Sequence, residues 1–134
     1  MERVEYSQLD QGYEFPCAIY QIDSTMVADY LGVIGETSEV YQDTGVVPPM
    51  AVAAFAMAQL SEHLSFPSGA IHVSQGFQFH RFASTQDSFT ICARVSQKRG
   101  RGRLQLMTIA IDVYNQGKER VLSGETTFML PASG

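Results

Sequence analysis

The chain has 134 residues, of which 45% are hydrophobic and 17% charged, so it suits one compact domain and is too short for two ordinary ones. Its formal net charge of −5 argues against a general nucleic-acid binder, whose affinity rests on Lys and Arg that neutralise phosphates. No apolar run reaches the roughly 20 residues of a membrane helix, and no secretory signal pattern is present, so we expect a cytoplasmic protein with no membrane partner. We expect a single domain over residues 1–134, with loose stretches at 1–11 and 131–134.

The first elements are a strand and a short helix. Alternating apolar residues from Tyr13 to Ile22 predict a half-buried strand. Asp23 or Ser24 then offers a helix cap, and the helix is expected to stop near Gly32.

A loop from Ile34 to Val47 leads to the second helix. Pro48-Pro49 suits a helix start, because the fixed φ of proline is already close to helical. The sequence from Met50 to Leu60 is apolar nearly all the way round, which predicts a helix that other elements enclose. His63 follows this helix, and we expect it to bind the last helical carbonyls.

The second half of the chain offers four strand candidates joined by short connections, which favour antiparallel neighbours. They are Ala70–Phe82, Ser88–Lys98, Arg103–Asn115 and Glu119–Leu130. One strand, two helices and a meander of long strands is an α+β order. The expected architecture is therefore a hot-dog fold, in which a curved antiparallel sheet wraps a central buried helix.

Neither the cysteines nor the histidines suggest a metal site. Cys17 and Cys92 stand in strand-like sequence without a CxxC motif or a second pair, so we expect two free, half-buried thiols. His72 and His80 share parity on one predicted strand, but eight residues at about 3.3 Å each separate them too far for common ligation.

A basic cluster from Lys98 to Arg103 interrupts two strand patterns and indicates a hairpin tip. One interpretation is a solvated turn whose glycines allow a tight connection. The other is a cationic tip, carrying Arg99 and Arg101, near the phosphates of a ligand.

Three stretches resemble the MaoC-like dehydratase group of hot-dog proteins, especially its amino-terminal, substrate-binding type of half. They are Gly35-Glu36-Thr37-Ser38-Glu39-Val40-Tyr41, then Val46-Val47-Pro48-Pro49 leading into the helix, and the aromatic-rich segment from His72 to Phe82 that ends near a His-Arg pair. Arg99-Gly100-Arg101-Gly102 also resembles the Arg/Gly-rich hairpin of such halves. The resemblance extends from about Tyr13 to Leu130.

The resemblance implies a site in the loop that begins at Gly35. Catalytic members carry Gly-Asp-x-Asn-Pro-aliphatic-His, whose Asp and His act on a water that adds across an enoyl thioester. Here Glu36 stands in the Asp position and Tyr41 in the His position, while Gly35 and Val40 match and Ser38 lies between them. Tyrosine titrates near pH 10 and is a poor general base at neutral pH. Without the resemblance, Glu36 and Tyr41 would suit a polar surface loop with one buried tyrosine.

The start of the second helix is the expected binding site for the thioester oxygen. Pro49 has no amide hydrogen, so amides such as those of Met50 and Ala51 remain as donors. Phe55 is a candidate for lining the acyl tunnel, although core packing is its default role.

The sequence therefore predicts an acyl-thioester-binding protein of the (R)-specific enoyl-CoA hydratase or 3-hydroxyacyl dehydratase type, with weak or no activity alone. It implies no cofactor, because coenzyme A or an acyl-carrier thioester is the substrate, and no metal. The expected partner is a second copy or a catalytic hot-dog paralogue, since an open sheet edge favours pairing. Two alternatives stay open: a hot-dog acyl-CoA thioesterase that uses Glu36 or Glu39, and a non-catalytic acyl-CoA binding module.

Overall fold

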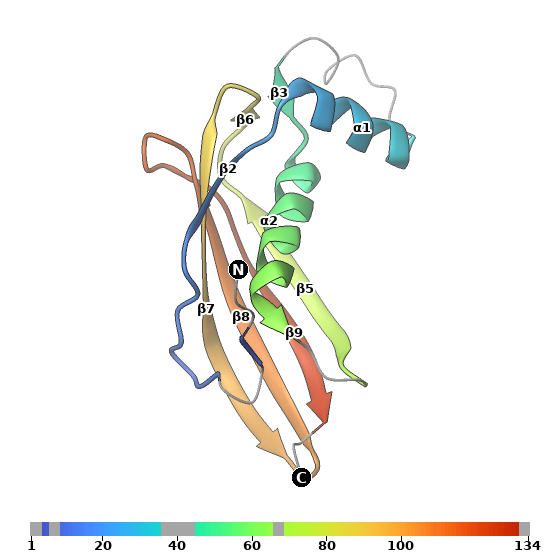
Figure 1. The fold of residues 1–134 in the computed structure, drawn as a ribbon, viewed down its shortest axis with the longest axis vertical. Helices are drawn as coiled ribbons and strands as arrows, with labels where there is room; N and C mark the ends of the chain where they lie inside the picture. The colour runs from blue at the N-terminus through green and yellow to red at the C-terminus, as the bar shows by residue number, and fades with distance from the viewer. Residues whose placement is uncertain (1–3, 6–8, 36–44, 66–68, 132–134) are drawn as a thin grey trace.

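The computed structural model describes residues 4–5, 9–35, 45–65 and 69–131 (Figure 1). The elements are β1 (Val4–Glu5), β2 (Ala18–Gln21), α1 (Ser24–Ile34), β3 (Val46–Val47), α2 (Pro49–His63), β4 (Leu64–Ser65), β5 (Ile71–Phe79), β6 (Ala83–Ser84), β7 (Ser88–Arg101), β8 (Leu104–Tyr114) and β9 (Arg120–Pro131). The predicted α+β order and the four long strands of the second half are confirmed.

The main sheet has five strands in the order β2-β7-β8-β9-β5, and all its neighbours are antiparallel. The long strands β7, β8 and β9 form a meander through two hairpins. The second hairpin turns at Asn115–Lys118, where Lys118 adopts a φ of 60° and the Asn115 side chain accepts the Gly117 and Glu119 amides. Strands β2 and β5 are the two edges of this sheet.

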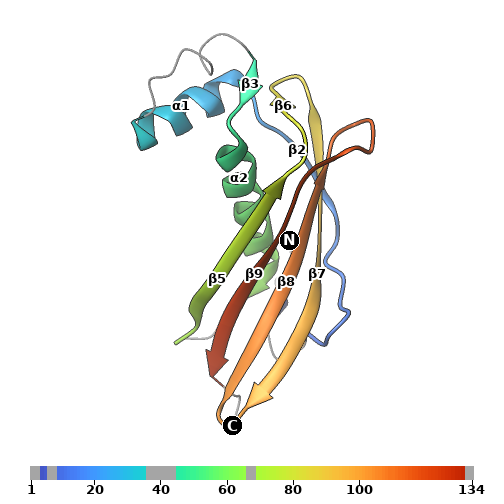
Figure 2. The same cartoon turned by 180° about the vertical axis from the view of Figure 1, so that it is seen from behind.

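The helix α2 lies across one face of the sheet, whereas neither helix of the described residues lies on the opposite face (Figures 1 and 2). Alternate residues of β8 from Met107 to Val113 are buried against the helix side. The residues of α2 that bury their side chains in this core are Ala51, Val52, Ala53, Ala56 and Leu60. We call this the inner face of the sheet and the other its outer face.

One stripe of α2 stays open within the chain. Met50 is 53% exposed, and Ala54 and Ala58 follow it at four-residue intervals on the exposed side. The prediction of an enclosed helix therefore holds for most of its circumference but not for this uncharged stripe.

The short helix α1 begins as predicted, since the Asp23 carboxylate accepts the Met26 amide at 2.8 Å. It continues past Gly32 to Ile34. There Gly35 caps it in the left-handed conformation, with a φ of 72°, and donates its amide to the Gly32 carbonyl.

Cys17 and Cys92 form a disulfide, so the prediction of free thiols is wrong. The cause is the register of β2 on β7, which sets Ala18 opposite Ile91 and so brings the preceding Cys17 opposite Cys92. Their Cα atoms are 4.5 Å apart, the separation of directly opposed residues in antiparallel strands. The two cysteines are 75 positions apart in sequence, and only the strand pairing brings them together.

Parts of the N-terminal stretch are attached to the domain. The Leu9 side chain is fully buried, and its carbonyl accepts Lys98 Nζ at 2.6 Å. Strand β1 pairs in parallel with β4. Among the described residues, neither helix is both long and apolar enough to cross a membrane.

Candidate functional site

The start of α2 forms part of the lining of a hollow. Strand β3 pairs with β6 through Val47 and Ala83, which holds the buried Pro48 and the first helical residue, Pro49, beside the end of β5 (Figure 1). The hollow has a volume of about 230 Å³. Its lining consists of Pro49, Phe79, His80, Arg81 and Phe82.

The side chains around this hollow are unusually apolar for a surface. Phe82 is 87% exposed, Met50 53% and Phe79 41%. Leaving three large apolar side chains in water is unfavourable, at roughly 25 cal/mol per Å² of apolar surface. Their grouping at one end of α2 is typical of a surface that binds an apolar ligand or a partner.

The first turn of α2 leaves one amide for a ligand. Ala51 donates its N–H to the Pro48 carbonyl at 2.9 Å, and Val52 does so at 3.3 Å. Pro49 has no amide hydrogen. Among the described first-turn residues, Met50 therefore carries the amide without a partner, at the positive end of the helix dipole. This N–H can donate to an oxygen that gains negative charge.

His80 and Arg81, directly after β5, are each bonded to groups of the same chain. His80 Nε2 lies 2.8 Å from Ser123 Oγ, and its backbone amide donates to the Val121 carbonyl. Arg81 Nη2 is 2.7 Å from Glu119 Oε2. Both side chains are thus engaged within the chain, and they form one wall of the hollow.

The predicted site residues of the motif loop and of α2 have different outcomes. Gly35 caps α1, and the loop resumes in the described residues at Gly45. The candidates Glu36, Ser38, Glu39, Val40 and Tyr41 lie outside the described residues. Of the helix residues, Pro49 lines the hollow and its sequence neighbour Met50 is exposed. The Ala51 side chain is buried, and Phe55 packs half-buried against the core.

The predicted arginines do not join this site within one chain. Arg99 and Arg101 belong to the tip of the β7–β8 hairpin. This tip lies at the end of the sheet remote from the start of α2 in both views (Figures 1 and 2). A role for them in the same site would require the partner's hairpin.

His63 and His72 differ from their predictions. His63 ends α2, but its buried Nε2 bonds to none of the described groups, so the expected cap is not formed by that nitrogen. A bulge between His72 and Ser74 breaks the parity of His72 with His80. His72 Nε2 lies 2.7 Å from Thr126 Oγ1, on the inner face, whereas His80 bonds Ser123 on the outer face. No motif in the sequence marks this bulge.

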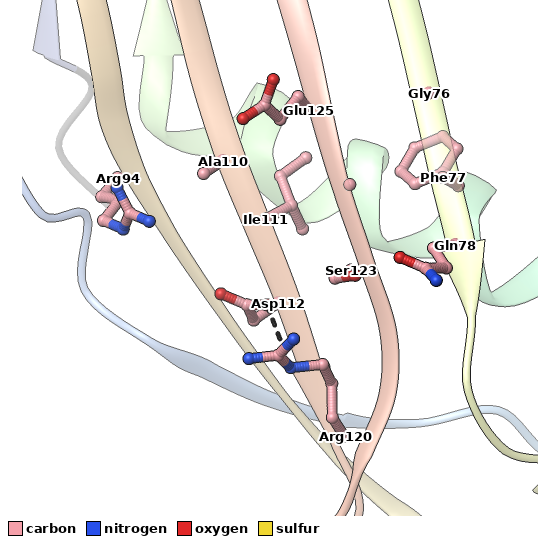
Figure 3. A pocket seen from close by; sticks show the side chains of 11 residues that line it. Gly76, Phe77, Gln78, Arg94, Ala110, Ile111, Asp112, Arg120, Ser123 and Glu125 are labelled. Atoms are coloured by element: carbon pink, nitrogen blue, oxygen red, sulfur yellow. Dashed lines mark ion pairs between the residues drawn. The ribbon is translucent and has the colours of Figure 1, made fainter.

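A second hollow, of about 520 Å³, lies on the outer face across β5, β9, β8 and β7 (Figure 3). Its lining includes Gly76 on β5 and Ala110 on β8, and Asp112 pairs with Arg120 at 3.5 Å. The sheet separates it from α2, so it is no part of the site at the helix start. Among the described residues, no group of three or more His, Cys, Asp or Glu side chains is arranged to hold a metal ion.

No protein-family model matches the sequence, and no curated protein matches it either. Solved structures do match the fold. The (R)-hydratase PhaJ1 from Pseudomonas aeruginosa has a TM-score of 0.80 at 21% identity, over 96% of this chain and 86% of its own. A monoamine oxidase regulatory protein from Archaeoglobus has a TM-score of 0.84 at 14% identity, over 100% of this chain and 98% of its own.

A third match is the ChsH1–ChsH2 complex from Mycobacterium tuberculosis, with a TM-score of 0.75 at 14% identity, over 90% of this chain and 98% of that one. The chain therefore has the hot-dog fold of the (R)-hydratases and MaoC-like dehydratases, as the sequence predicted. At these identities the matches establish the fold and leave the activity to be argued from the site.

Proposed function

We propose that the chain is an acyl-thioester-binding hot-dog protein of the (R)-specific enoyl-CoA hydratase or 3-hydroxyacyl dehydratase type. Its own hydratase activity is weak or absent, because Glu36 and Tyr41 replace the Asp and His of the catalytic loop. The ligand is an acyl group on coenzyme A or on a carrier protein, and no further cofactor takes part.

The observation that carries this proposal is the hollow at the start of α2. Its exposed aromatic rings, Phe79 and Phe82, line the hollow together with Pro49, and the next residue in the chain, Met50, carries the open amide of the helix N-terminus. A thioester ligand has the matching chemistry, since its acyl chain is apolar and its carbonyl oxygen accepts hydrogen bonds. The described ends of the motif loop are Gly35, which caps α1, and Gly45, which directly precedes the strand β3 that leads into the same helix.

The altered motif determines what such a site can do. A carboxylate at Glu36 still suits the activation of water, although it is one methylene longer than Asp. Tyr41 can donate a hydrogen bond but is a poor base near neutral pH, because the ordinary pKa of tyrosine is about 10. The pair is therefore better suited to holding a thioester than to hydrating it.

The proposal includes a second hot-dog subunit. The uncharged stripe of α2 and the edge strand β5 are not covered by any of the described residues, and a second subunit would cover both. One structural neighbour, ChsH1–ChsH2, is itself a complex. The partner here is either a second copy or a catalytic paralogue.

The test is hydration of short and long enoyl-CoA thioesters by the purified chain, followed by loss of the conjugated thioester absorbance. We expect a slow rate or none, and any rate should vanish in Glu36→Gln while Glu62→Gln, an exposed glutamate at the end of α2, keeps it. A rate that persists in Glu36→Gln would contradict the role of that carboxylate. Rapid release of free coenzyme A from a saturated acyl-CoA would instead identify a thioesterase.

Binding is measured separately, because a binding subunit has no turnover. The ligands are butyryl- and dodecanoyl-dethia-CoA, in which a methylene replaces the thioester sulfur and the carbonyl is kept. Calorimetry should show saturable binding of at least one of them. A chain that binds neither and hydrates nothing, at any chain length, would contradict the proposed function.

A further inference from the structure

The disulfide between Cys17 and Cys92 lies on the outer face of the sheet, where it is open to solvent. Cys17 is exposed and Cys92 is half-buried, whereas Ile91 and Ala93, the neighbours of Cys92 on β7, point into the core. Both cysteines also line a hollow of about 260 Å³. A small molecule can therefore reach this bond in the folded chain.

This smaller hollow adjoins the larger one on the outer face. Arg94, Ala110 and Asp112 line both of them (Figure 3). Arg94 follows Cys92 by two residues along β7, so the two side chains share the outer face. The disulfide and a guanidinium group therefore lie in one connected depression, which we call the outer-face depression.

Arg94 is the cation of this depression that can bind an anion. Among the residues that the structure describes, its guanidinium forms no ion pair, whereas Asp112 pairs with Arg120 at 3.5 Å. Glu14 lies opposite Arg94 through an isolated bridge, and Glu125 lies two strands away in the same row of the sheet. Both glutamates are exposed, so water and salt screen their charges.

We propose that the outer-face depression is a site of thiol–disulfide exchange, at which Cys17–Cys92 reacts with a small anionic thiol whose carboxylate or phosphate binds Arg94. The product is a reversible mixed disulfide on the protein. The sheet separates this site from α2, so the inference does not rest on the proposed acyl-thioester site.

The exchange begins when the thiolate of the small molecule attacks Sγ of Cys17, the more exposed cysteine. A new S–S bond forms, the bond to Cys92 breaks, and its electron pair leaves on Cys92 as a thiolate that takes a proton from water. A second small thiolate then attacks the small-molecule sulfur of the mixed disulfide and releases Cys17. Two small thiols are thereby oxidised to one disulfide, and the protein bond is reduced to two thiols.

Arg94 assists two parts of this reaction. Its positive charge stabilises the thiolate that leaves on Cys92, two residues away on the same face. It also attracts the carboxylate or phosphate of the attacking molecule, which raises the concentration of that molecule beside the bond. The first effect helps every thiol, whereas the second helps only an anionic one. A preference for anionic thiols therefore separates binding at Arg94 from the reactivity of the bond.

The strands on both sides of the disulfide are paired by hydrogen bonds that do not depend on it. On one side, the strand β2 pairs with β7. On the other, Phe15 donates its amide to the Ala93 carbonyl at 2.9 Å, and Gly12 donates to the Val95 carbonyl at 2.7 Å. The exchange can therefore proceed in the folded chain, and the thiolate of Cys92 stays close enough to reverse it.

The test is the rate at which different thiols reduce the bond in the purified, oxidised chain. Free protein thiols are trapped with N-ethylmaleimide at intervals and counted by mass. The neutral thiol is 2-mercaptoethanol, and the anionic ones are 3-mercaptopropionate, glutathione and coenzyme A. Each rate constant is divided by that of the same thiol with oxidised 2-mercaptoethanol, a neutral disulfide, so that the intrinsic reactivity of the thiol cancels.

At low ionic strength, the anionic thiols should react about three- to tenfold faster than 2-mercaptoethanol on this normalised scale, as one charge interaction near a protein surface allows. The preference should shrink in about 0.5 M salt, because salt screens that interaction. A preference for glutathione over coenzyme A would identify a carboxylate thiol as the substrate. The opposite preference would identify a phosphate thiol.

Three variants that keep both cysteines test the role of Arg94. Arg94→Gln should remove the preference for anionic thiols, whereas Arg103→Gln, an exposed arginine in the turn after β7, should keep it. Glu14→Gln should strengthen the preference, because it removes the carboxylate opposite Arg94. The melting temperature of each oxidised variant shows that the compared proteins are folded.

The attacked sulfur is identified by peptide mapping of the mixed disulfide after brief exposure to glutathione. The adduct should be found on Cys17. Two single-cysteine variants give a matched check: with oxidised glutathione, Cys92→Ser should form its adduct several-fold faster than Cys17→Ser, because the remaining Cys17 is the more exposed residue.

Three results would overturn the inference. Equal normalised rates for all four thiols, or a preference that persists in Arg94→Gln, would contradict anion binding at Arg94. A bond that about 10 mM glutathione reduces in the unfolded chain but leaves intact in the folded chain would contradict the exchange site itself. An adduct found mainly on Cys92 would contradict the order of attack. Each of these results is independent of whether the chain binds acyl thioesters.

Discussion

Phe77 on β5 lies over Gly124, its direct opposite on β9, so that its ring occupies the place of the missing side chain. A Cβ on Gly124 would collide with that ring and lie 2.7 Å from the Gly76 carbonyl oxygen. An aromatic ring over a glycine compensates for the packing that the glycine cannot supply. The contact holds β5, the edge strand of the sheet, against β9.

Gly124→Ala should therefore destabilise the protein by about 1–3 kcal/mol, because the backbone oxygen of Gly76 cannot move aside as a flexible side chain would. Urea unfolding followed by circular dichroism measures this change. Gly100→Ala is the control, since Gly100 also lies in a strand and a Cβ there meets nothing within 4 Å. Equal stabilities of the two variants would contradict the close approach of Phe77.

The disulfide between Cys17 and Cys92 should contribute strongly to stability. It closes a loop of 75 residues in the unfolded chain, and the chain-entropy model assigns such a loop about 4 kcal/mol, an upper estimate. We expect Cys92→Ser to lose roughly 2–4 kcal/mol in the free energy of unfolding.

Thiol counting supplies the direct measurement. The denatured chain should show no reactive thiol before reduction and two after it. Two reactive thiols in the freshly purified, unreduced protein would contradict the bond. Cys17 is exposed directly before the edge strand β2, so the native bond is open to an added reductant.

The order of elements was accessible from the sequence because it depends on local patterns. Pro48-Pro49 before an apolar run predicted the start of α2, and Asp23 predicted the cap of α1. The apolar residues that recur along Arg103–Asn115 likewise predicted the strand β8. Each of these signals lies within a few residues of the feature that it predicts.

Features that depend on register were not accessible in the same way. The sequence shows neither that β2 lies on β7, which joins Cys17 to Cys92, nor that a bulge turns His72 to the inner face. The distance of Arg99 from the start of α2 follows from the length of β7 and could not be read from spacing. Long-range pairing is the common cause of these three differences.

Phe82 should be important for ligand binding and unimportant for folding. Its side chain is 87% exposed and lines the hollow at Pro49. Phe82→Ser should weaken binding of dodecanoyl-dethia-CoA by about tenfold or more, since covering a Phe ring with a ligand contributes about 1.5–3 kcal/mol. Calorimetric titration measures the affinity of the unmodified chain and of Phe82→Ser for this ligand.

Val33 offers the matched control, because it is also 87% exposed but belongs to α1 and not to the lining of the hollow. Val33→Ser should leave the affinity unchanged. If both variants lose affinity equally, the hollow is not the acyl site. If Phe82→Ser lowers the melting temperature by several degrees, its effect on binding would reflect folding instead.

Tyr20 carries a buried hydroxyl without a hydrogen-bond partner among the described residues. Its ring packs on Phe89 with centroids 5.6 Å apart, on the side of β2 that faces the core. Burial disfavours the phenolate and raises the pKa of Tyr20 well above the ordinary value of about 10. The folded chain therefore keeps this proton at pH values where the unfolded chain releases it.

Because the pKa is raised in the folded state, the free energy of unfolding should be unaffected by this group below pH 10 and should fall as the pH rises beyond it. Tyr20→Phe should remove the part of this alkaline fall in the free energy of unfolding that the ionisation of Tyr20 causes. Near neutral pH the same variant should be as stable as the unmodified chain or more stable by up to about 1 kcal/mol, because it deletes an unsatisfied buried hydroxyl. Urea unfolding of both proteins at pH 7 and pH 11 measures the two effects. A loss of stability in Tyr20→Phe at pH 7 would show that the hydroxyl makes a hydrogen bond in the folded protein.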